Sequence, residues 1–585
     1  MAGLGPGSSV DHRGTIISDG DARAIVERLI DPETDRPTAA DLRFDEATFT
    51  GAVPFRALRV TGVASFDRTV FEHEVDLASA TFDGGASFWG ARFKSLLHLD
   101  NAEFVQQAMF LEAVFGSSVT AYRATFRQAQ FHRAEFAGLA GFALARFEGE
   151  AHFSQAQFGG EARFSQATGE GLMDFTAASF AGDLDVAGMT CTNLGLSRTV
   201  FEKRVHLGVP MCTGTLNLTD ARFKEGVVVR AVAAVVDAQR ARFDSTTTFQ
   251  LRYAQVRLAN AILEKPTSIA FQRVTWGHDE SALASLDPAA SERPKIDSLG
   301  GVDTAHLQLT DIDLTSCRFF GAVHLDKLSL AGDCLFDLEV GWGWRLLGTR
   351  RILPYRTGRR RILQEERDCR ARNGRWSSWS DSVLSPSAGA AGVQGGIALV
   401  AGARPSDLVA LYRQLRKGYE DAKDEPGAGD FYYGEMEMRR HSDRFGWWER
   451  RLLGLYWAVS GYGLRALRAL MWLMVAMSTT VVALMLWGLP NGPAKAETVG
   501  AVPLPGQSLS LTTTTPLPKL TLPYRERITA ARFWKTVPMT LNSVVFRSSG
   551  QNLTPRGNAI EMTSRLVEPA LLALFVLALR SRVKR

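Results

Sequence analysis

The chain has 585 residues, enough for several domains, and its 67 lysines and arginines nearly balance its 62 aspartates and glutamates. This balance favours neither a nucleic-acid-binding protein nor an acidic disordered tail. Five cysteines with no Cys-x-x-Cys pair exclude a disulfide framework and indicate a reducing compartment. The start, Met1 to Pro6, has no basic or apolar stretch typical of a signal peptide, so we expect the N-terminal domain to stay in the cytoplasm.

Residues 1–40 are predicted to be an N-terminal arm with a capping helix. Ser18 stands three residues before the acidic Asp21, which is the pattern of a helix start. Apolar residues follow at helical spacing: Ala22, Ile25, Val26, Leu29 and Ile30. We expect this helix to cover the open end of the domain that follows. A loosely attached arm is the alternative.

A phenylalanine repeat occupies residues 41–275. From Phe44 onwards, phenylalanine or an aliphatic residue recurs at alternating steps of five and six residues, a period of eleven. A small residue stands two positions earlier, as in Ala91-Arg92-Phe93. Residues i−2 and i of an extended chain share a face, so alanine and phenylalanine point inward and the residue between them points to water.

This spacing requires a chain that turns every five or six residues and coils on itself. A helix is a poor alternative, because side chains at a mean step of about 5.5 residues drift around a helix of 3.6 residues per turn and form no single stripe. Each phenylalanine is expected to stack on the one a coil below, where burial contributes roughly 1.5–3 kcal/mol. A phenylalanine-rich β-sandwich is the alternative. The expected core of the column includes Phe82, Phe88, Phe93, Phe104, Phe110, Phe115, Phe126, Phe153 and Phe158.

The Ala-x-Phe series resembles the pentapeptide-repeat family, in the variant whose repeats alternate between five and six residues. The resemblance implies a mainly β fold over residues 41–275, a right-handed quadrilateral β-helix with four short faces per coil. The pattern loosens after Phe180. A polar insertion is predicted at residues 276–302, and further solenoid coils are predicted at residues 303–341.

Two connecting segments are expected next. Residues 342–404 read as a linker, rich in arginine and then in Ser, Gly and Ala, whose arginines suit anionic lipid headgroups or nucleic acid unless they are only solvated. Residues 405–445 are predicted to form a helical hairpin, capped by Ser406 and broken at residues 424–427. The hairpin resembles the connector of bacterial pentapeptide-repeat proteins that carry a C-terminal membrane module.

Residues 446–585 are predicted to be a membrane module. Residues 469–489 contain no charge, and at ~1.5 Å rise per residue they cover the ~30 Å of a bilayer core. Aromatic and arginine residues before this span predict an interfacial helix on the cytosolic side. A second span is predicted at residues 559–579, with a buried core helix as the alternative. The basic residues after it place both termini in the cytoplasm, in a multi-pass protein of the plasma (inner) membrane.

Residues 533–546, between the spans, are too short to cross and read as a re-entrant helix. Span, re-entrant helix, loop and span resemble a two-helix potassium-channel module. A potassium filter needs stacked carbonyls from a glycine-rich strand, and this chain has an arginine there, so a degenerate pore without potassium selectivity is expected. Glu568 is expected to pair with Arg565, with a functional role as the alternative. The pore-like candidates are Thr540, Arg547, Gly550 and Glu568.

No catalytic motif, metal-binding spacing or cofactor fingerprint is found, so we expect no enzyme, no metal and no cofactor. The first functional hypothesis is a membrane-tethered scaffold whose solenoid binds a protein partner of unknown identity at the lipid bilayer. The second is an ion-channel subunit, which would have to form a homo-oligomer to enclose a pore. The third is a DNA-mimicking solenoid that binds topoisomerase, which the near balance of charges over residues 41–275 disfavours. No nucleic-acid partner is expected.

Overall fold

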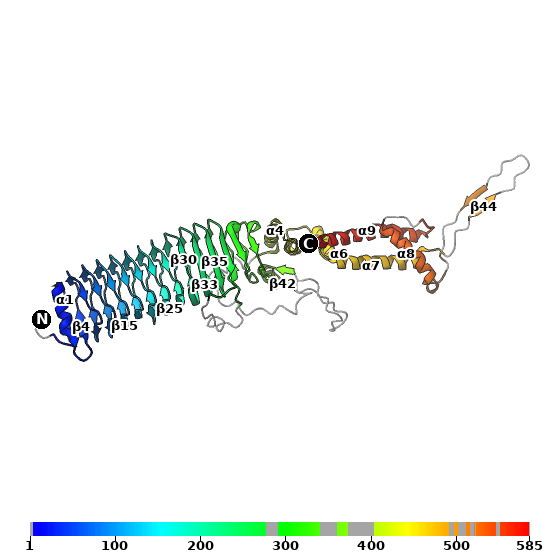
Figure 1. The fold of residues 1–585 in the computed structure, drawn as a ribbon. Helices are drawn as coiled ribbons and strands as arrows, with labels where there is room; N and C mark the ends of the chain where they lie inside the picture. Colours follow the sequence, from blue (N-terminus) through cyan, green and yellow to red (C-terminus); the bar gives the residue numbers. More distant parts are fainter. Residues whose placement is uncertain are drawn as a thin grey trace, which may run out of the picture. The chain divides into compact units, whose positions relative to one another are not determined.

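The computed structural model describes residues 4–276, 291–339, 360–372, 403–490, 496–500, 511–514, 520, 522–545 and 550–583. It divides into two compact units (Figure 1). The first contains Met1–Ala403 and Gln414–Lys423, and the second contains Arg404–Arg413 and Asp424–Arg585. The predicted polar residues 277–290 and most of the predicted linker, residues 342–359 and 373–402, lie outside the described residues.

The first unit is a parallel β-solenoid of about 13 turns, which confirms the predicted fold class (Figure 1). One sheet consists of β2 (Ile16–Ile17), β5 (Thr48–Phe49), β9 (Val70–Phe71), β13 (Arg92–Phe93), β16 (Val114–Phe115), β19 (Glu135–Phe136), β23 (Gln157–Phe158), β26 (Ser179–Phe180), β29 (Val200–Phe201), β32 (Arg222–Phe223), β34 (Arg242–Phe243) and β37 (Ile262–Leu263). A second consists of β6 (Val53–Pro54), β10 (Val75–Asp76), β14 (Leu97–His98), β17 (Val119–Thr120), β20 (Ala140–Gly141), β24 (Ala162–Arg163) and β27 (Leu184–Asp185). A 22-stranded sheet covers the remaining faces.

The interior of the solenoid is a set of phenylalanine columns. All nine expected core phenylalanines are at most 1% exposed, and Ala91 is fully buried while Arg92 between it and Phe93 is exposed. Phe71 and Phe93 are in register on adjacent coils, as are Phe93 and Phe115. The rings of Phe88 and Phe110 are parallel with centroids 4.7 Å apart. The phenylalanines of the Ala-x-Phe repeat therefore point inward, and their rings stack from coil to coil along the axis of the solenoid.

Many corners of the solenoid hold a non-glycine residue in the left-handed region. Glu46 has a φ of 58°, and the Ala47 amide donates to the Phe44 carbonyl at 3.0 Å, as in a type II turn. Asn101 and Arg123 adopt the same conformation on later coils. The Glu46 amide donates to the Asp67 carbonyl of the next coil at 2.7 Å, so hydrogen bonds between coils stabilise corners that do not require glycine.

The N-terminal end is closed by helix α1 (Asp19–Leu29), with the capping box expected at Ser18 and Asp21. Its Ala22, Ile25 and Leu29 are buried, whereas Ile30 follows the helix and is 38% exposed. Two strands precede it: β1 (Ser8–Asp11) pairs with β4 (Arg36–Arg43), and β2 pairs with β5. Parallel pairing thus begins inside the segment that the sequence marked as an arm.

The solenoid continues through part of the segment expected to be an insertion. Strand β39 (Lys295–Ser298) pairs in parallel with β36 (Gln255–Arg257). Strands β38 (Thr267–Phe271), β40 (Leu307–Thr310) and β41 (Ser329–Ala331) then extend the same sheet. The coils therefore resume at Lys295 rather than at residue 303.

The described helices of the second unit are α4 (Pro405–Asp421), which contributes to both units, α5 (Glu425–His441), α6 (Trp447–Ser460), α7 (Ala466–Ala483) with its π-helical end (Leu484–Gly488), α8 (Ala530–Val544) and α9 (Pro555–Val583). Strands β44 (Glu497–Gly500) and β45 (Leu511–Thr514) pair in the predicted outer loop. Two details of the hairpin differ from the prediction. Helix α4 begins at Pro405, so Ser406 lies inside its first turn. The break between the helices falls at residues 422–424, because Asp424 accepts the Gly427 amide as the N-cap of α5 and Pro426 suits a first turn.

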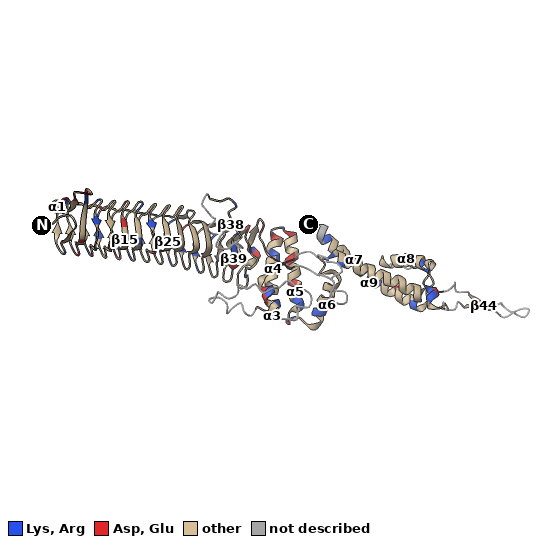
Figure 2. Cartoon of the chain, turned by 90° about the horizontal axis from the view of Figure 1, so that it is seen from below, with Lys and Arg blue, Asp and Glu red and all other residues tan. Residues whose placement is uncertain are grey.

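Two helical segments, Ala466–Gly488 and Pro555–Arg580, are long and apolar enough to cross a membrane. Helices α7 and α9 pack along each other, and α8 contacts both (Figures 1 and 2). Many of their apolar side chains are exposed, including Leu467, Met474, Val482, Leu566 and Leu577. Such a surface is typical of helices that face lipid.

Candidate functional site

The solenoid carries charged residues of both signs (Figure 2), and several of them pair between coils. Lys94 lies 2.8 Å from Glu72, and Lys224 lies 2.7 Å from Glu202, each one coil away. The hydrogen bond from Lys94 holds the pKa of Glu72 below its usual value. These exposed pairs contribute little to stability, but each places a positively charged lysine beside a negatively charged glutamate on the surface of the solenoid. That arrangement does not imitate the continuous negative charge of DNA.

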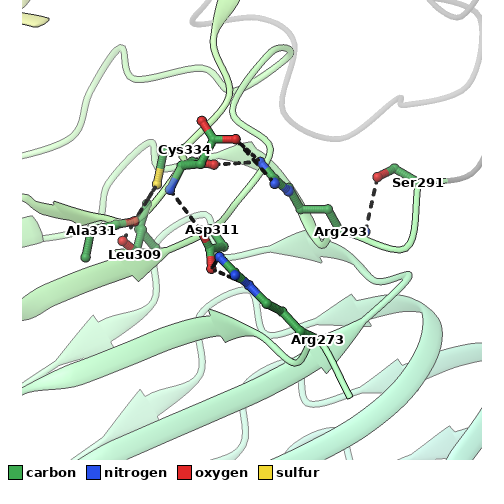
Figure 3. A network of polar contacts seen from close by, with 8 residues as sticks. Arg273, Ser291, Arg293, Leu309, Asp311, Ala331 and Cys334 are labelled. Atoms are coloured by element: carbon green, nitrogen blue, oxygen red, sulfur yellow. Dashed lines mark hydrogen bonds and ion pairs between the residues drawn. The ribbon is translucent and has the colours of Figure 1, made fainter. Parts of the chain in front are cut away.

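A buried carboxylate ties the coils on both sides of residues 277–290 (Figure 3). Arg273 donates to Asp311 at 2.7 Å, and Asp311 also accepts the Asp333 amide at 2.8 Å. Arg293, on the other side of the segment, donates to the Asp333 carbonyl at 2.6 Å. The Asp333 amide and then Arg273 lower the pKa of Asp311. The network therefore joins Arg273 and Arg293, which flank residues 277–290 in the sequence, to the last coils.

This network predicts a pH-dependent contribution to stability. Asp311→Asn is expected to lower the free energy of unfolding by about 1.5–3 kcal/mol at pH 7, as for hydrogen bonds to a charged group. Because the folded pKa of Asp311 is lowered, its contribution is present above the unfolded value and is lost as pH falls through the folded value. Melting of both proteins from pH 7 downward should show their difference shrinking. A constant difference would contradict the assignment.

The C-terminal coil is capped by a segment expected to be linker. Strand β43 (Arg360–Ile362) pairs with β42 (Asp337–Glu339) and leads into α3 (Gln364–Arg372). The buried Glu365 carboxylate accepts the amides of Phe319 and Phe320, the latter at 2.8 Å. Beside it, Glu366 is fully buried between Arg360 and Arg370, at 2.6 and 2.5 Å. The segment was missed because α3 has no apolar periodicity and binds through carboxylates.

Glu365 is therefore expected to stabilise the end of the solenoid. Glu365→Ala leaves two backbone donors unpaired, at a cost of about 1–3 kcal/mol each when they are buried. Glu365→Gln keeps an acceptor oxygen and should lose less. Chemical denaturation of the three proteins tests this order. Equal losses for Ala and Gln would show that the carboxamide cannot replace the cap, and no loss for Ala would contradict the cap itself.

Helices α5, α6 and α7 pack together around Tyr462, which lies between α6 and α7. The hydroxyl of Tyr462, which is buried between two left-handed glycines, donates to Glu437 at 2.9 Å. Burial and Glu437 raise the pKa of Tyr462, so its hydroxyl keeps its proton and remains a donor. Trp457 donates to the Tyr433 hydroxyl at 2.9 Å, and the Arg440 guanidinium lies 4.4 Å from the Trp457 ring. These contacts hold the turn before α7, the first candidate span, against helices α5 and α6.

Helix α6 presents apolar and basic residues on its surface. Trp447, Trp448 and Leu452 are more than half exposed, and Arg450 and Arg451 lie among them. This combination of residues is typical of a helix that lies in the membrane interface.

The C-terminal end of α7 and the N-terminal end of α9 meet at two glycines, Gly488 and Gly557. A Cβ on Gly557 would lie 2.7 Å from the Gly488 Cα and 2.8 Å from its carbonyl oxygen. Carbonyls freed at the π-helical end of α7 accept hydrogen bonds: Thr554 donates to Trp487 at 2.5 Å, Arg527 to Leu486 at 2.9 Å, and Arg532 to Leu489 at 2.5 Å. The three helices are thus joined by polar contacts as well as by the apolar cluster Leu484, Leu489, Met539 and Leu553.

Of the pore-like candidates, Thr540 and Glu568 are buried, Gly550 is exposed with a φ of 65°, and Arg547 lies outside the described residues. The expected Arg565–Glu568 pair is wrong, because Arg565 binds Glu561 at 2.6 Å, one helical turn before it. Glu568 instead contacts Ser543 of α8 at 2.7 Å. Ser543 was missed, although its spacing from Thr536 and Thr540 places all three on one face of α8.

Comparison with known proteins identifies the repeat. A family model described as pentapeptide repeats (9 copies) matches residues 44–92 and 121–168. These residues fall within the phenylalanine columns, so this part of the solenoid consists of pentapeptide repeats. No curated protein and no solved structure matches the chain.

Proposed function

We propose that this chain is a non-enzymatic scaffold, anchored in a membrane by α7 and α9, whose pentapeptide-repeat solenoid binds a protein partner. The observation that carries the proposal is the contrast between the two units. The solenoid buries its apolar side chains and exposes paired charges, whereas α7 and α9 expose apolar side chains such as Leu467 and Leu566. The exposed apolar surface of α7 and α9 is unfavourable in water and favourable in a lipid bilayer.

The distribution of basic residues supports one orientation of the two spans in the membrane. Arg450, Arg451, Arg465 and Arg468 precede or begin the first span, and Arg580 ends the second. Arginine excess marks the cytosolic side of a membrane, so both ends of the hairpin lie in the cytoplasm and the solenoid faces it. A plasma (inner) membrane of a bacterium is the setting that the resemblance of the connector implies.

The surface chemistry of the solenoid supports a binding role. The carboxylates of the solenoid faces form ion pairs from one coil to the next, as Glu72 does with Lys94. A regular, rigid surface of this kind suits recognition of a folded protein partner.

A second candidate function is supported by α8. This short helix lies against α7 and α9 and buries Thr536, Thr540 and Ser543, as a re-entrant helix in a channel subunit would. A chain with two spans encloses a pore only as a homo-oligomer.

Planar-bilayer recording of the purified protein and of Arg547→Ala separates the two functions: a conductance that changes with Arg547 favours the channel, and no conductance favours the scaffold. No observation favours a topoisomerase-binding DNA mimic.

The scaffold is tested by capture from detergent-solubilised membranes, with the parent chain and Phe93→Asp as baits. The substitution disrupts the solenoid and leaves α7 and α9 intact, so both proteins should be found in membranes while only the parent retains a stoichiometric partner. Arg92→Asp, on the outer face of the same strand, is the matched control for added charge. A partner that binds Phe93→Asp equally well would contradict binding through the solenoid.

A further inference from the structure

Three arginines lie on two aromatic rings at the start of the first candidate span. The guanidinium groups of Arg440 and Arg468 lie 4.4 and 5.3 Å from the Trp457 ring. The Arg465 guanidinium lies 5.4 Å from the Tyr433 ring. The two rings form one aromatic platform, because Trp457 donates to the Tyr433 hydroxyl at 2.9 Å. Contacts of this kind hold guanidinium groups in place without neutralising their charge.

The positive charge of Arg465 is not balanced by an acidic side chain in the described part of the chain. Glu437, beside the platform, binds Arg440 at 2.5 Å, whereas Arg465 forms no ion pair with a described residue. Residues 461–488 contain Arg465 and Arg468 and no acidic residue. The two arginines are three residues apart, so they lie on one side of the helix, where like charges are destabilising. A bound anion would offset this repulsion.

The position of these arginines favours an anion that belongs to a lipid. The uncharged residues 469–488 of the first span begin directly after Arg468. Helices α7 and α9 are antiparallel, because Gly488 at the end of α7 meets Gly557 near the start of α9, so Arg580 ends the second span on the same side as Arg468. Basic groups at the end of an apolar span reach the level of the lipid headgroups.

We propose that Arg465 and Arg468 bind the phosphate group of an anionic phospholipid in the leaflet next to α6. The proposal rests on the membrane anchor proposed above. Guanidinium groups bind phosphate oxygens through paired, charge-assisted hydrogen bonds. A headgroup with a net negative charge fits this pair of arginines better than phosphatidylcholine, whose own cation would add to their charge. The platform of Tyr433 and Trp457 holds the arginines before the lipid binds, which reduces the entropy lost on binding.

Titration of the 585-residue chain in detergent micelles with short-chain phosphatidylglycerol, followed by native mass spectrometry, tests the site. One phosphatidylglycerol should bind with a Kd at least about tenfold lower than that of phosphatidylcholine, as for hydrogen bonds between charged groups. Arg465→Gln, which keeps a long polar side chain and removes the charge, should raise this Kd at least about tenfold. Equal binding of the two lipids, or equal binding by parent and variant, would overturn the proposal.

Three controls make the result specific. Arg451→Gln removes an exposed arginine on α6 that lies over Trp447, outside the platform, and should leave the Kd unchanged. Arg465→Lys keeps the charge and should lose less affinity than Arg465→Gln, so that a loss caused by misfolding alone is recognised. Inorganic phosphate should compete poorly; competition as strong as that of the lipid would indicate a site for free phosphate and overturn the lipid site.

Flotation with phosphatidylcholine vesicles separates a failure of the site from a failure of the anchor. Parent and Arg465→Gln should float equally, because the apolar surfaces of α7 and α9 hold both in the bilayer. If both float and phosphatidylglycerol is not preferred, only the lipid site is contradicted. If neither floats, the anchor is contradicted and the lipid site with it.

Discussion

Phe93→Asp is expected to unfold the solenoid around the coil that contains β13. Phe93 is 1% exposed and stacks between Phe71 and Phe115, with ring centroids 4.8 and 5.2 Å away. Removing the ring costs about 3–5 kcal/mol, and burying an unpaired carboxylate adds a comparable penalty. Each coil is covered only by its neighbours, so the damage extends to the coils on either side. Circular dichroism should show a lower melting temperature and reduced β signal at 25 °C.

Arg92→Asp is the control for this experiment. Arg92 occupies the same strand but is exposed, so the same aspartate there should change the free energy of unfolding by less than about 0.5 kcal/mol. Similar melting of both variants would contradict the inward orientation of phenylalanine.

Gly557→Ala is expected to separate the C-terminal end of α7 from the N-terminal end of α9. The added Cβ would lie 2.7 Å from the Gly488 Cα and 3.0 Å from the Leu553 Cβ. Since the nearest atoms belong to backbone, the helices must move apart, at a cost of about 1–3 kcal/mol or more. The movement would also strain the bond from Thr554 to the Trp487 carbonyl. Thermal unfolding in detergent and protease accessibility of the 490–530 loop measure the effect.

A second glycine gives the matched control. Gly454 lies inside α6, and a Cβ there would meet nothing within 4 Å. Gly454→Ala should therefore be neutral or stabilise by up to about 1 kcal/mol through helix propensity. If Gly557→Ala were equally harmless, the close approach of α7 and α9 would be refuted.

The sequence was sufficient for the parts of the fold that repeat. The inward position of Phe93 and Ala91 follows from two-residue periodicity, and the stacking of Phe93 on Phe115 follows from the constant coil length. The capping box at Ser18 and the uncharged stretch of the first span are also local signals. Such features depend on residues near each other in sequence, which a single chain displays directly.

The parts that could not be predicted depend on distant residues. Glu365 binds amides some 45 residues earlier, and its helix has no apolar stripe to reveal it. The sequence predicts a pair between Glu568 and Arg565, which are neighbours on one helix, whereas Glu568 contacts Ser543, 25 residues away. The return of the solenoid at Lys295 was hidden by a polar segment that interrupts the repeat. In each case a tertiary hydrogen bond or strand pairing outweighed the local pattern.

Flotation of the 585-residue chain with phospholipid vesicles after an alkaline, high-salt wash tests the membrane anchor of the solenoid most directly. The apolar surfaces of α7 and α9 should keep the protein in the lipid fraction, because such a wash removes proteins held by charge alone. A chain truncated before Phe445 should stay in the dense fraction with its solenoid folded. Recovery of the 585-residue chain in the dense fraction as a folded, monodisperse protein would contradict the anchor.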